Sequence, residues 1–174
     1  MRNERGIDYV PNLPTEEVFT MPHKEGVNGV VTSTKPLNYG GSLIENFTIR
    51  FENGRIVDFS AETGQEALKR LIETDEGSRY LGEVALVQHH SPITGMDIVF
   101  YDTLYDENAS VHLAIGNAYP ICMEGGTQMS SEELVKNGAN VSTAHADFMI
   151  GGPEMEIDGE LSDGSREPLF QNGN

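Results

Sequence analysis

Hydrophobic and polar residues alternate most regularly between Asn46 and Ala61, where the sequence reads NFTIRFENGRIVDFSA. Alternation with a period of two is typical of a strand that buries one face. We therefore expect two strands, over 47–51 and 57–61, that pair as an antiparallel hairpin.

The length of the hairpin loop decides which residues face each other. A two-residue turn at Asn53-Gly54 pairs Ile49 with Asp58 and mixes the two faces, whereas a three-residue loop, Glu52 to Gly54, pairs Ile49 with Val57. The second register keeps one face apolar, so we predict the three-residue loop, with Gly54 in the left-handed position of a bulge.

An amphipathic helix is expected next along the chain. Thr63 and Glu66 have the spacing of a capping box, and Gly77 is a typical residue just beyond a helix end. The apolar stripe of this helix consists of Leu68, Leu71 and Ile72.

Shorter apolar runs complete the predicted elements. Strands are expected over 83–87, 97–101 and 145–150, and Asp158-Gly159 indicates a turn. Short helices are expected over 131–137, capped by Ser130 or Ser131, and over 111–115, capped by Asn108 or Ser110 and ended by Gly116. This irregular order predicts an α+β fold: a mixed, mostly antiparallel, β-rich domain with a few short helices.

Composition narrows the class of protein. The 174 residues correspond to one domain, and 11 Lys+Arg against 28 Asp+Glu give a net charge of −17, which disfavours nucleic acid and membrane surfaces as partners. No apolar run is long enough to span a bilayer, and the first six residues lack the apolar core of a signal peptide. The single Cys122 fits a reducing compartment, so we expect a cytoplasmic protein.

Candidate chemistry begins with His145 and Asp147. Residues i and i+2 of a strand project to the same face, so the imidazole and the carboxylate would enter one space. Both are ligands of zinc-like ions, although a His-x-Asp pair is also common on exposed strands. The apolar residues 148–150 that follow would place the pair at the edge of a buried cleft.

Further candidates are a histidine and several acids. His112 lies among apolar residues five positions after Glu107, where it could be a ligand or an ordinary core histidine. Glu83 opens a buried apolar strand and needs a metal, an arginine or a helix N-terminus as partner. The pair Glu16-Glu17 could equally be solvated surface.

Together these residues supply two histidines and four carboxylates without a cysteine. This donor set suits two divalent ions of the zinc, cobalt or manganese type and disfavours a thiolate zinc site. Two such ions commonly activate a water for hydrolysis. The residues alone therefore suggest a two-metal hydrolase.

Four separated segments, in this order, resemble the M29 family of metalloaminopeptidases, the thermophilic aminopeptidase group. They are NLPTEEVFT (12–20), LGEVALV (81–87), DENASVHLAIGNAYP (106–120) and HADFMIGG (145–152). The resemblance covers essentially the whole chain, and it implies that residues 1–174 are the C-terminal catalytic domain of such a protein, without the family's N-terminal domain.

The resemblance also implies roles for residues. It makes Tyr119 a donor to the oxyanion, although a packing tyrosine is the alternative, and Glu16 or Glu83 a carrier of the proton. Alternation along the strand would send one of Glu16 and Glu17 to the metals, and we favour Glu17. Val111 stands where the family usually has cysteine. The implied metal ligands are Glu17, Glu83, Glu107, His112, His145 and Asp147, with Glu83 best placed to bridge two ions.

The function implied by the resemblance is removal of N-terminal residues from peptides with a free amino terminus, by a homodimer. One alternative is a folded metal-binding fragment without peptidase activity, and another is an acidic β-rich binding domain without metal. Phe19 and Met149 are expected in the core, and the other histidines at the surface or behind the ligands. These histidines are His23, His89 and His90.

Overall fold

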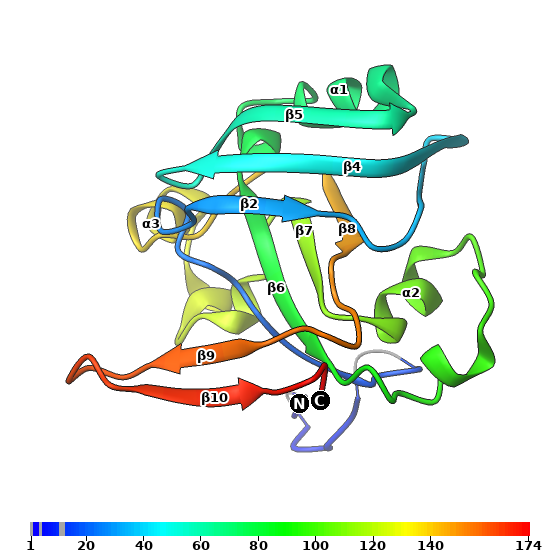
Figure 1. The fold of residues 1–174 in the computed structure, drawn as a ribbon. Coiled ribbons are helices and arrows are strands. Elements are labelled where there is room, and N and C mark those ends of the chain that lie inside the picture. Colours follow the sequence, from blue (N-terminus) through cyan, green and yellow to red (C-terminus); the bar gives the residue numbers. More distant parts are fainter. Residues whose placement is uncertain (1, 4, 11–12) are drawn as a thin grey trace.

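Two antiparallel four-stranded sheets and a separate two-stranded hairpin make up the fold (Figure 1). The computed structural model describes residues 2–3, 5–10 and 13–174, so Asn12, the first residue of the first motif, lies outside the described part. The predicted mixed α+β class with antiparallel pairing is confirmed.

The first sheet has the strand order β1-β6-β7-β8. Its strands are β1 (Glu17–Thr20), β6 (Leu81–Val87), β7 (His112–Gly116) and β8 (His145–Met149). The strands expected over 83–87 and 145–150 are thus confirmed.

The second sheet contains the regular alternation noted above. Its strands are β2 (Gly29–Thr32), β3 (Leu37–Tyr39), β4 (Ser42–Glu52) and β5 (Arg55–Thr63). The two sheets share one core, in which the rings of Phe47 and Phe148 lie 5.4 Å apart.

The predicted register of the β4-β5 hairpin is wrong. A two-residue turn at Asn53-Gly54 pairs Phe51 with Ile56, and a bulge then brings Ile49 opposite Phe59. Both turn residues have positive φ, 50° and 79°, as the tight turn requires. The extra residue of the bulge restores the apolar face that the two-residue turn alone would have lost.

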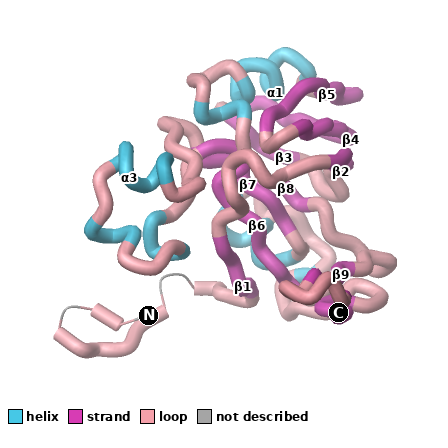
Figure 2. Tube along the Cα trace, turned by 90° about the vertical axis from the view of Figure 1, so that its left-hand side faces the viewer, coloured by secondary structure: helices cyan, strands magenta, loops and turns pink. Residues whose placement is uncertain are grey.

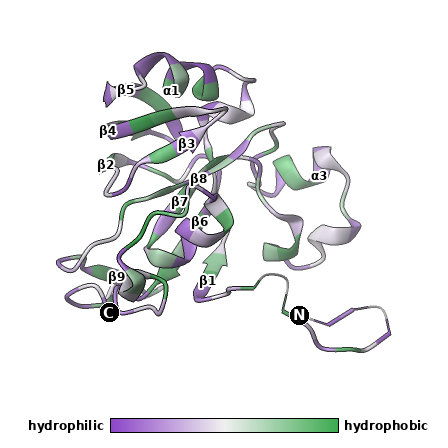
Figure 3. Ribbon diagram, turned by 90° about the vertical axis from the view of Figure 1, so that its right-hand side faces the viewer, coloured by the Kyte–Doolittle hydropathy of each residue, from purple (hydrophilic) through white to green (hydrophobic). Residues whose placement is uncertain are grey.

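Helix α1 (Gln65–Ile72) packs its predicted stripe, which is fully buried, onto the second sheet. Figure 3 colours this helix hydrophobic on one side and hydrophilic on the other. The predicted capping box is wrong, because Thr63 is still in strand β5 and the helix begins after Gly64, at φ 76°. The helix also ends before Gly77, which belongs to the 3₁₀ turn η1 (Gly77–Arg79).

The strand predicted over 97–101 is absent, and this part of the chain is a loop. Asp97 and Tyr101 have positive φ, 53° and 57°, which a strand does not allow. The buried carboxylate of Asp106 instead accepts hydrogen bonds from the backbone N–H groups of Phe100 and Asp102. The loop leads into α2 (Thr103–Asp106) and the 3₁₀ turn η3 (Glu107–Ala109).

The helix predicted over 111–115 is also wrong, because residues 112–115 belong to strand β7. All five residues of β7 are buried between β6 and β8. A short apolar run buried on both faces has no period that separates a strand from a helix.

Smaller elements complete the chain. Helix α3 (Ser131–Lys136) has the predicted cap at Ser130, with both hydrogen bonds of a capping box, and lies to one side of the sheets (Figure 2). The predicted Asp158-Gly159 turn is wrong, since both residues lie in β9 (Ile157–Glu160), which pairs with β10 (Arg166–Phe170). The remaining 3₁₀ turns are η2 (Thr94–Met96), η4 (Pro120–Cys122) and η5 (Gly126–Gln128). None of the helices in the described ranges has the length and apolar character needed to cross a bilayer.

A bulge at Gly82 gives strand β6 its two-sided character. In a regular strand Leu81 and Glu83 would share a face, but Leu81 belongs to the core whereas Glu83 faces the opposite side. The β6-β7 pairing shifts between these two residues, which permits the change of face. Glycine is required there, because a Cβ on Gly82 would lie 2.2 Å from the carbonyl oxygen of Asn117.

We expect Gly82→Ala to lower the free energy of unfolding by about 1–3 kcal/mol, because the added methyl group forces strand β6 away from the backbone of Asn117. Chemical denaturation measures the change. Gly95→Ala is the matched control, since a Cβ there meets no atom within 4 Å. Equal stabilities for the two variants would contradict this account of the bulge.

Candidate metal centre

Six acidic and histidine side chains converge on the face of the first sheet that is turned away from the core. Four strands and the turn η3 contribute them. They are Glu17, Glu83, Glu107, His112, His145 and Asp147. The structure thus brings together all six residues named as metal ligands in the sequence.

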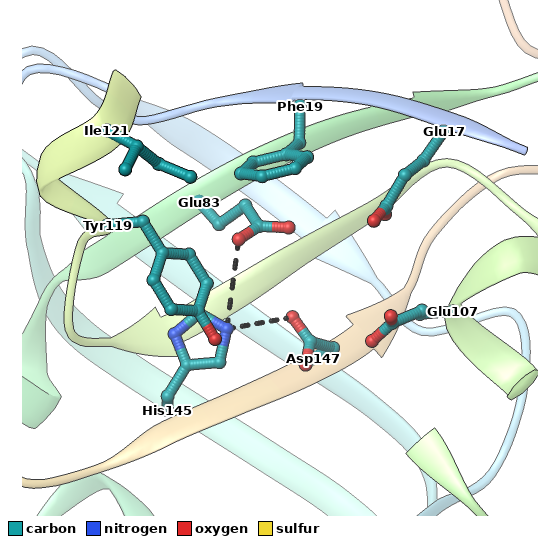
Figure 4. A pocket seen from close by; sticks show the side chains of 8 residues that line it. All are labelled: Glu17, Phe19, Glu83, Glu107, Tyr119, Ile121, His145 and Asp147. Carbon is teal, nitrogen blue, oxygen red and sulfur yellow. Dashed lines mark ion pairs between the residues drawn. The ribbon is translucent and has the colours of Figure 1, made fainter. Parts of the chain in front are cut away.

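A hollow lies above this cluster, and Figure 4 shows the side chains that line it. Its volume is about 200 Å³. His112 is fully buried beneath it. The residues that line it are Glu17, Phe19, Glu83, Glu107, Tyr119, Ile121, His145 and Asp147.

Alternation along β7 and β8 explains how one sheet serves both core and pocket. On β8, Ala146 and Phe148 pack in the core, so His145 and Asp147 face the other way. Ala114 of β7 lies opposite Asp147 on one side and Glu83 on the other. A small side chain at this central position leaves room for the two carboxylates to approach each other.

The imidazoles lie between the carboxylates. His112 Nε2 is 3.1 Å from Glu17 Oε2 and 3.5 Å from Glu83 Oε1. His145 Nε2 is 3.8 Å from Glu83 Oε2 and 3.4 Å from Asp147 Oδ1 (Figure 4). The two oxygens of Glu83 therefore face different histidines.

Backbone carbonyl groups orient both rings. Nδ1 of His112 lies 3.0 Å from the carbonyl oxygen of Ser110, and Nδ1 of His145 lies 2.8 Å from that of Asn117. A carbonyl oxygen only accepts, so each Nδ1 carries the proton and donates it. Nε2 is thus the atom that each neutral ring would offer to a cation.

Several polar atoms of the cluster lack a hydrogen bond of acceptable geometry. They include Glu17 Oε2, His112 Nε2 and Asp147 Oδ1, all buried. Unpaired buried polar atoms are costly unless something compensates them. Three overlapping groups of three residues each offer ligand atoms within 4.8 Å of one another, all nitrogen and oxygen. This donor set fits divalent ions of the zinc, cobalt or manganese type.

Without a cation, protons supply the positive charge of the cluster. Burial lowers the pKa of His112, but Glu17 and Glu83 raise it more, to about 10. Burial likewise lowers the pKa of His145, while Asp147 raises it to about 9. Burial and the nearby Asp147 raise the pKa of Glu107 to about 8.

The structure does not bring Glu16 to the cluster. Glu16 is exposed and lines another hollow with Val18, on the opposite face of strand β1. Glu17 faces the cluster with only 4 % of its side chain exposed. Alternation along the strand thus separates the two adjacent acids.

Aromatic and aliphatic side chains form one wall of the pocket. Tyr119 packs its ring 4.8 Å from that of His145 and 6.2 Å from that of Phe19. Phe19 was expected in the core but lines the pocket, as its position two residues after Glu17 could have indicated. No pattern in the sequence pointed to Ile121, which is the middle residue of the 3₁₀ turn η4.

The remaining expectations concern residues outside the pocket. Met149 is buried, as expected. His90 contacts Asn174 and packs edge-on against His89, and His23 packs against Gly138. None of these three histidines belongs to a metal-ligand group among the described residues.

Comparison with known proteins identifies relatives over the whole chain. The family model for thermophilic metalloprotease (M29) matches residues 1–174. Aminopeptidase AmpS of Bacillus subtilis (strain 168) is 65% identical over 172 residues, and aminopeptidase 2 of Geobacillus stearothermophilus is 56% identical over 172 residues. Each alignment covers 99% of this chain but 42% of the relative.

A solved structure has the same fold. Wild-type AmpT from Thermus thermophilus superposes with a TM-score of 0.92 at 50% sequence identity. The match covers 99% of this chain and 42% of that chain. The chain therefore spans less than half of the length of these relatives.

Removal of metal by a chelator should lower the melting temperature more at pH 8.5 than at pH 5.5. The raised pKa values mean that the metal-free fold binds more protons than the unfolded chain, whose His and Glu have pKa values of about 6.5 and 4.3. This stabilisation is complete below the unfolded values and is lost as the pH rises through 8 to 10. Metal ligation needs deprotonated ligands, so its contribution grows over the same range.

Thermal melting with and without chelator at both pH values measures the difference. Asp147→Asn serves as a control that should reduce it, because the amide lacks the carboxylate charge. A chelator effect that is equal at both pH values, or larger at pH 5.5, would count against a carboxylate-lined metal site.

Proposed function

Since the chain belongs to the thermophilic metalloprotease family M29, we propose that it forms the metal-binding catalytic part of an aminopeptidase. The observation that carries this proposal is the buried cluster of carboxylates and imidazoles, in which atoms of Glu17, His112 and Asp147 lack a hydrogen bond of acceptable geometry. The relatives that match the whole chain are named aminopeptidases, which supports the reaction class.

We assign two divalent ions of the zinc, cobalt or manganese type to the six clustered residues. Glu83 is the residue suited to join the two positions, because its two oxygens face different histidines. When bound, such ions supply a nucleophilic water at neutral pH and polarise the scissile carbonyl group.

The substrates proposed are peptides with a free amino terminus. The α-amino group is cationic near neutral pH, and the carboxylates that line the pocket attract it. Phe19 and Ile121 give the pocket an apolar side where the side chain of the terminal residue can lie. The pocket volume of about 200 Å³ suits one terminal residue better than the middle of a folded chain.

Two further groups would act on the substrate itself. Burial, together with the neighbouring Asp147, raises the pKa of Tyr119, so its phenol stays protonated and can donate to the oxyanion that develops on the carbonyl group. Transfer of a proton to the leaving amine needs a carboxylate in the pocket. Of the two candidates from the sequence, Glu16 does not line the pocket, and Glu83, which does, can carry the proton only through an oxygen that is not committed to a cation.

We also propose that the protein works in the cytoplasm as a homodimer. A single cysteine and no disulfide pair support a reducing compartment. Light scattering of the purified chain measures the number of subunits, and a monomer at all concentrations would contradict the dimer.

Glu83→Gln should leave the fold intact and weaken metal binding by at least about 10–100-fold, the loss typical even of residues that only support a ligand. Elemental analysis and hydrolysis of a leucyl anilide measure metal content and turnover. Glu66→Gln on the exposed side of α1 is the matched control. Full metal content and turnover in Glu83→Gln would remove Glu83 from the site, and a wild-type chain that binds metal without turnover would be a metal-binding module only.

Tyr119→Phe should lower kcat by about 100-fold, as removal of one oxyanion donor does elsewhere, with little change in metal content. The ring, and hence its packing on His145, is retained. Steady-state kinetics with the same anilide separate kcat from KM. A variant with wild-type kcat would make Tyr119 a packing residue.

A further inference from the structure

A buried amide outside the proposed ligand set connects two segments that carry ligands. We propose that Asn108 is a positioning residue, which holds Glu17 and Glu107 in the pocket by tying strand β1 to the turn η3. The inference deepens the proposed metal site. Its test by Zn²⁺ titration rests on the proposed function, whereas its test by hydrogen exchange does not.

Asn108 is bonded on three sides although its surface is completely buried. Its Oδ1 accepts a hydrogen bond from the backbone N–H of Glu16 at 2.7 Å. Its Nδ2 donates to the carbonyl oxygen of Leu104 at 2.9 Å. The backbone carbonyl oxygen of Asn108 accepts a hydrogen bond from Ser91 Oγ at 2.9 Å. A buried amide with these partners has one fixed orientation.

The first of these bonds bears on Glu17. Strand β1 has four residues and is the edge strand of its sheet, paired with β6 in the described structure. The Glu16 N–H that bonds Asn108 belongs to the residue immediately before Glu17 and is 92 positions away in sequence. Asn108 therefore provides a second anchor at the end of β1 that carries the carboxylate.

The second bond bears on Glu107. Leu104 lies in helix α2, and its carbonyl group is near the helix end, where carbonyl groups lack a partner within the helix. The Asn108 side chain satisfies this group across one turn and so determines how the chain passes from α2 into η3. Glu107 is the first residue of η3, and its carboxylate points into the pocket.

An anchor is needed because the two carboxylates repel each other. Glu17 and Glu107 both line the pocket, where like charges held away from bulk water repel. A neutral amide can hold both backbone segments without adding charge to the cluster. Of the three ligand groups, two contain Glu17 or Glu107 and share His112, whereas the group Glu83, His145 and Asp147 contains neither.

The first test is hydrogen exchange of the metal-free chain, which does not depend on the proposed function. In Asn108→Ala, amides of residues 16–20 and 104–109 should exchange about tenfold faster, while those of α1 keep their rates. Ile44→Val, a buried change in β4, is the control for general destabilisation and should leave 16–20 unchanged. Unchanged exchange over 16–20 in Asn108→Ala would overturn the inference.

A second variant separates the two bonds. Asn108→Asp keeps an acceptor for the Glu16 N–H but turns a carboxylate oxygen toward the Leu104 carbonyl group. Exchange should then stay slow over 16–20 and become faster over 104–109. Equal acceleration in both segments would contradict the assignment of the bonds, and this variant remains informative if Asn108→Ala does not fold.

The second test is titration of the metal-free variants with Zn²⁺ by calorimetry. Asn108→Ala should lose about 10–100-fold in affinity for one of two equivalents, with the other equivalent retained. Ile44→Val should bind as the wild type does. Equal weakening of both equivalents, or wild-type binding, would contradict a positioning role. A wild-type chain that binds no Zn²⁺ would contradict the proposed function, and the exchange result would still decide the role of Asn108.

Discussion

The constraint on which this structure depends is the burial of four carboxylates around two imidazoles. Carboxylates brought together away from water repel one another and need positive charge nearby. In the metal-free chain His112 and His145 provide it as protonated rings, with pKa values of about 10 and 9. A fold that positions such a cluster is suited to exchange these protons for divalent cations.

The first sheet can contribute to both the core and the pocket because its two faces carry different side chains. One face joins the shared core through residues such as Phe148, and the other presents the acids and imidazoles, with Phe19 of β1 in the wall of the pocket. Small residues at the centre, such as Ala114, let the acids on neighbouring strands approach one another. The bulge at Gly82 lets Leu81 face the core and Glu83, two residues later on β6, face the pocket.

Hydrogen bonds from the backbone and from buried amides give the pocket its rigidity. The carbonyl groups of Ser110 and Asn117 select the ring nitrogen that faces the acids. Asn108 connects the edge strand with the turn that carries Glu107. Groups that bear no charge themselves therefore control where the charged groups lie, which is the general role of residues that surround metal ligands.

The sequence by itself determined what depends on neighbours along the chain. The pairing of His145 with Asp147 on one strand face follows from a period of two, and the buried stripe of α1 follows from helical spacing. The motifs carried the resemblance to the family and with it the six clustered residues. Local patterns could not determine whether residues 111–115 form a strand or a helix, because a run buried on both faces has no distinguishing period.

Tertiary structure decided what depends on partners distant in sequence. The β4-β5 hairpin combines a two-residue turn with a bulge, and together they keep its apolar face toward the core. The sequence rule for hairpin loops considered the turn alone and so missed this bulge. Which of Glu16 and Glu17 faces the cluster is determined by the pairing of β1 with β6 and by the hydrogen bond from the Glu16 N–H to Asn108. The apolar wall at Ile121 came from the 3₁₀ turn η4, which tertiary structure places beside the pocket. Contacts between segments about 90 residues apart leave no pattern in the sequence near either partner, because burial and hydrogen bonding arise only when the chain brings them together.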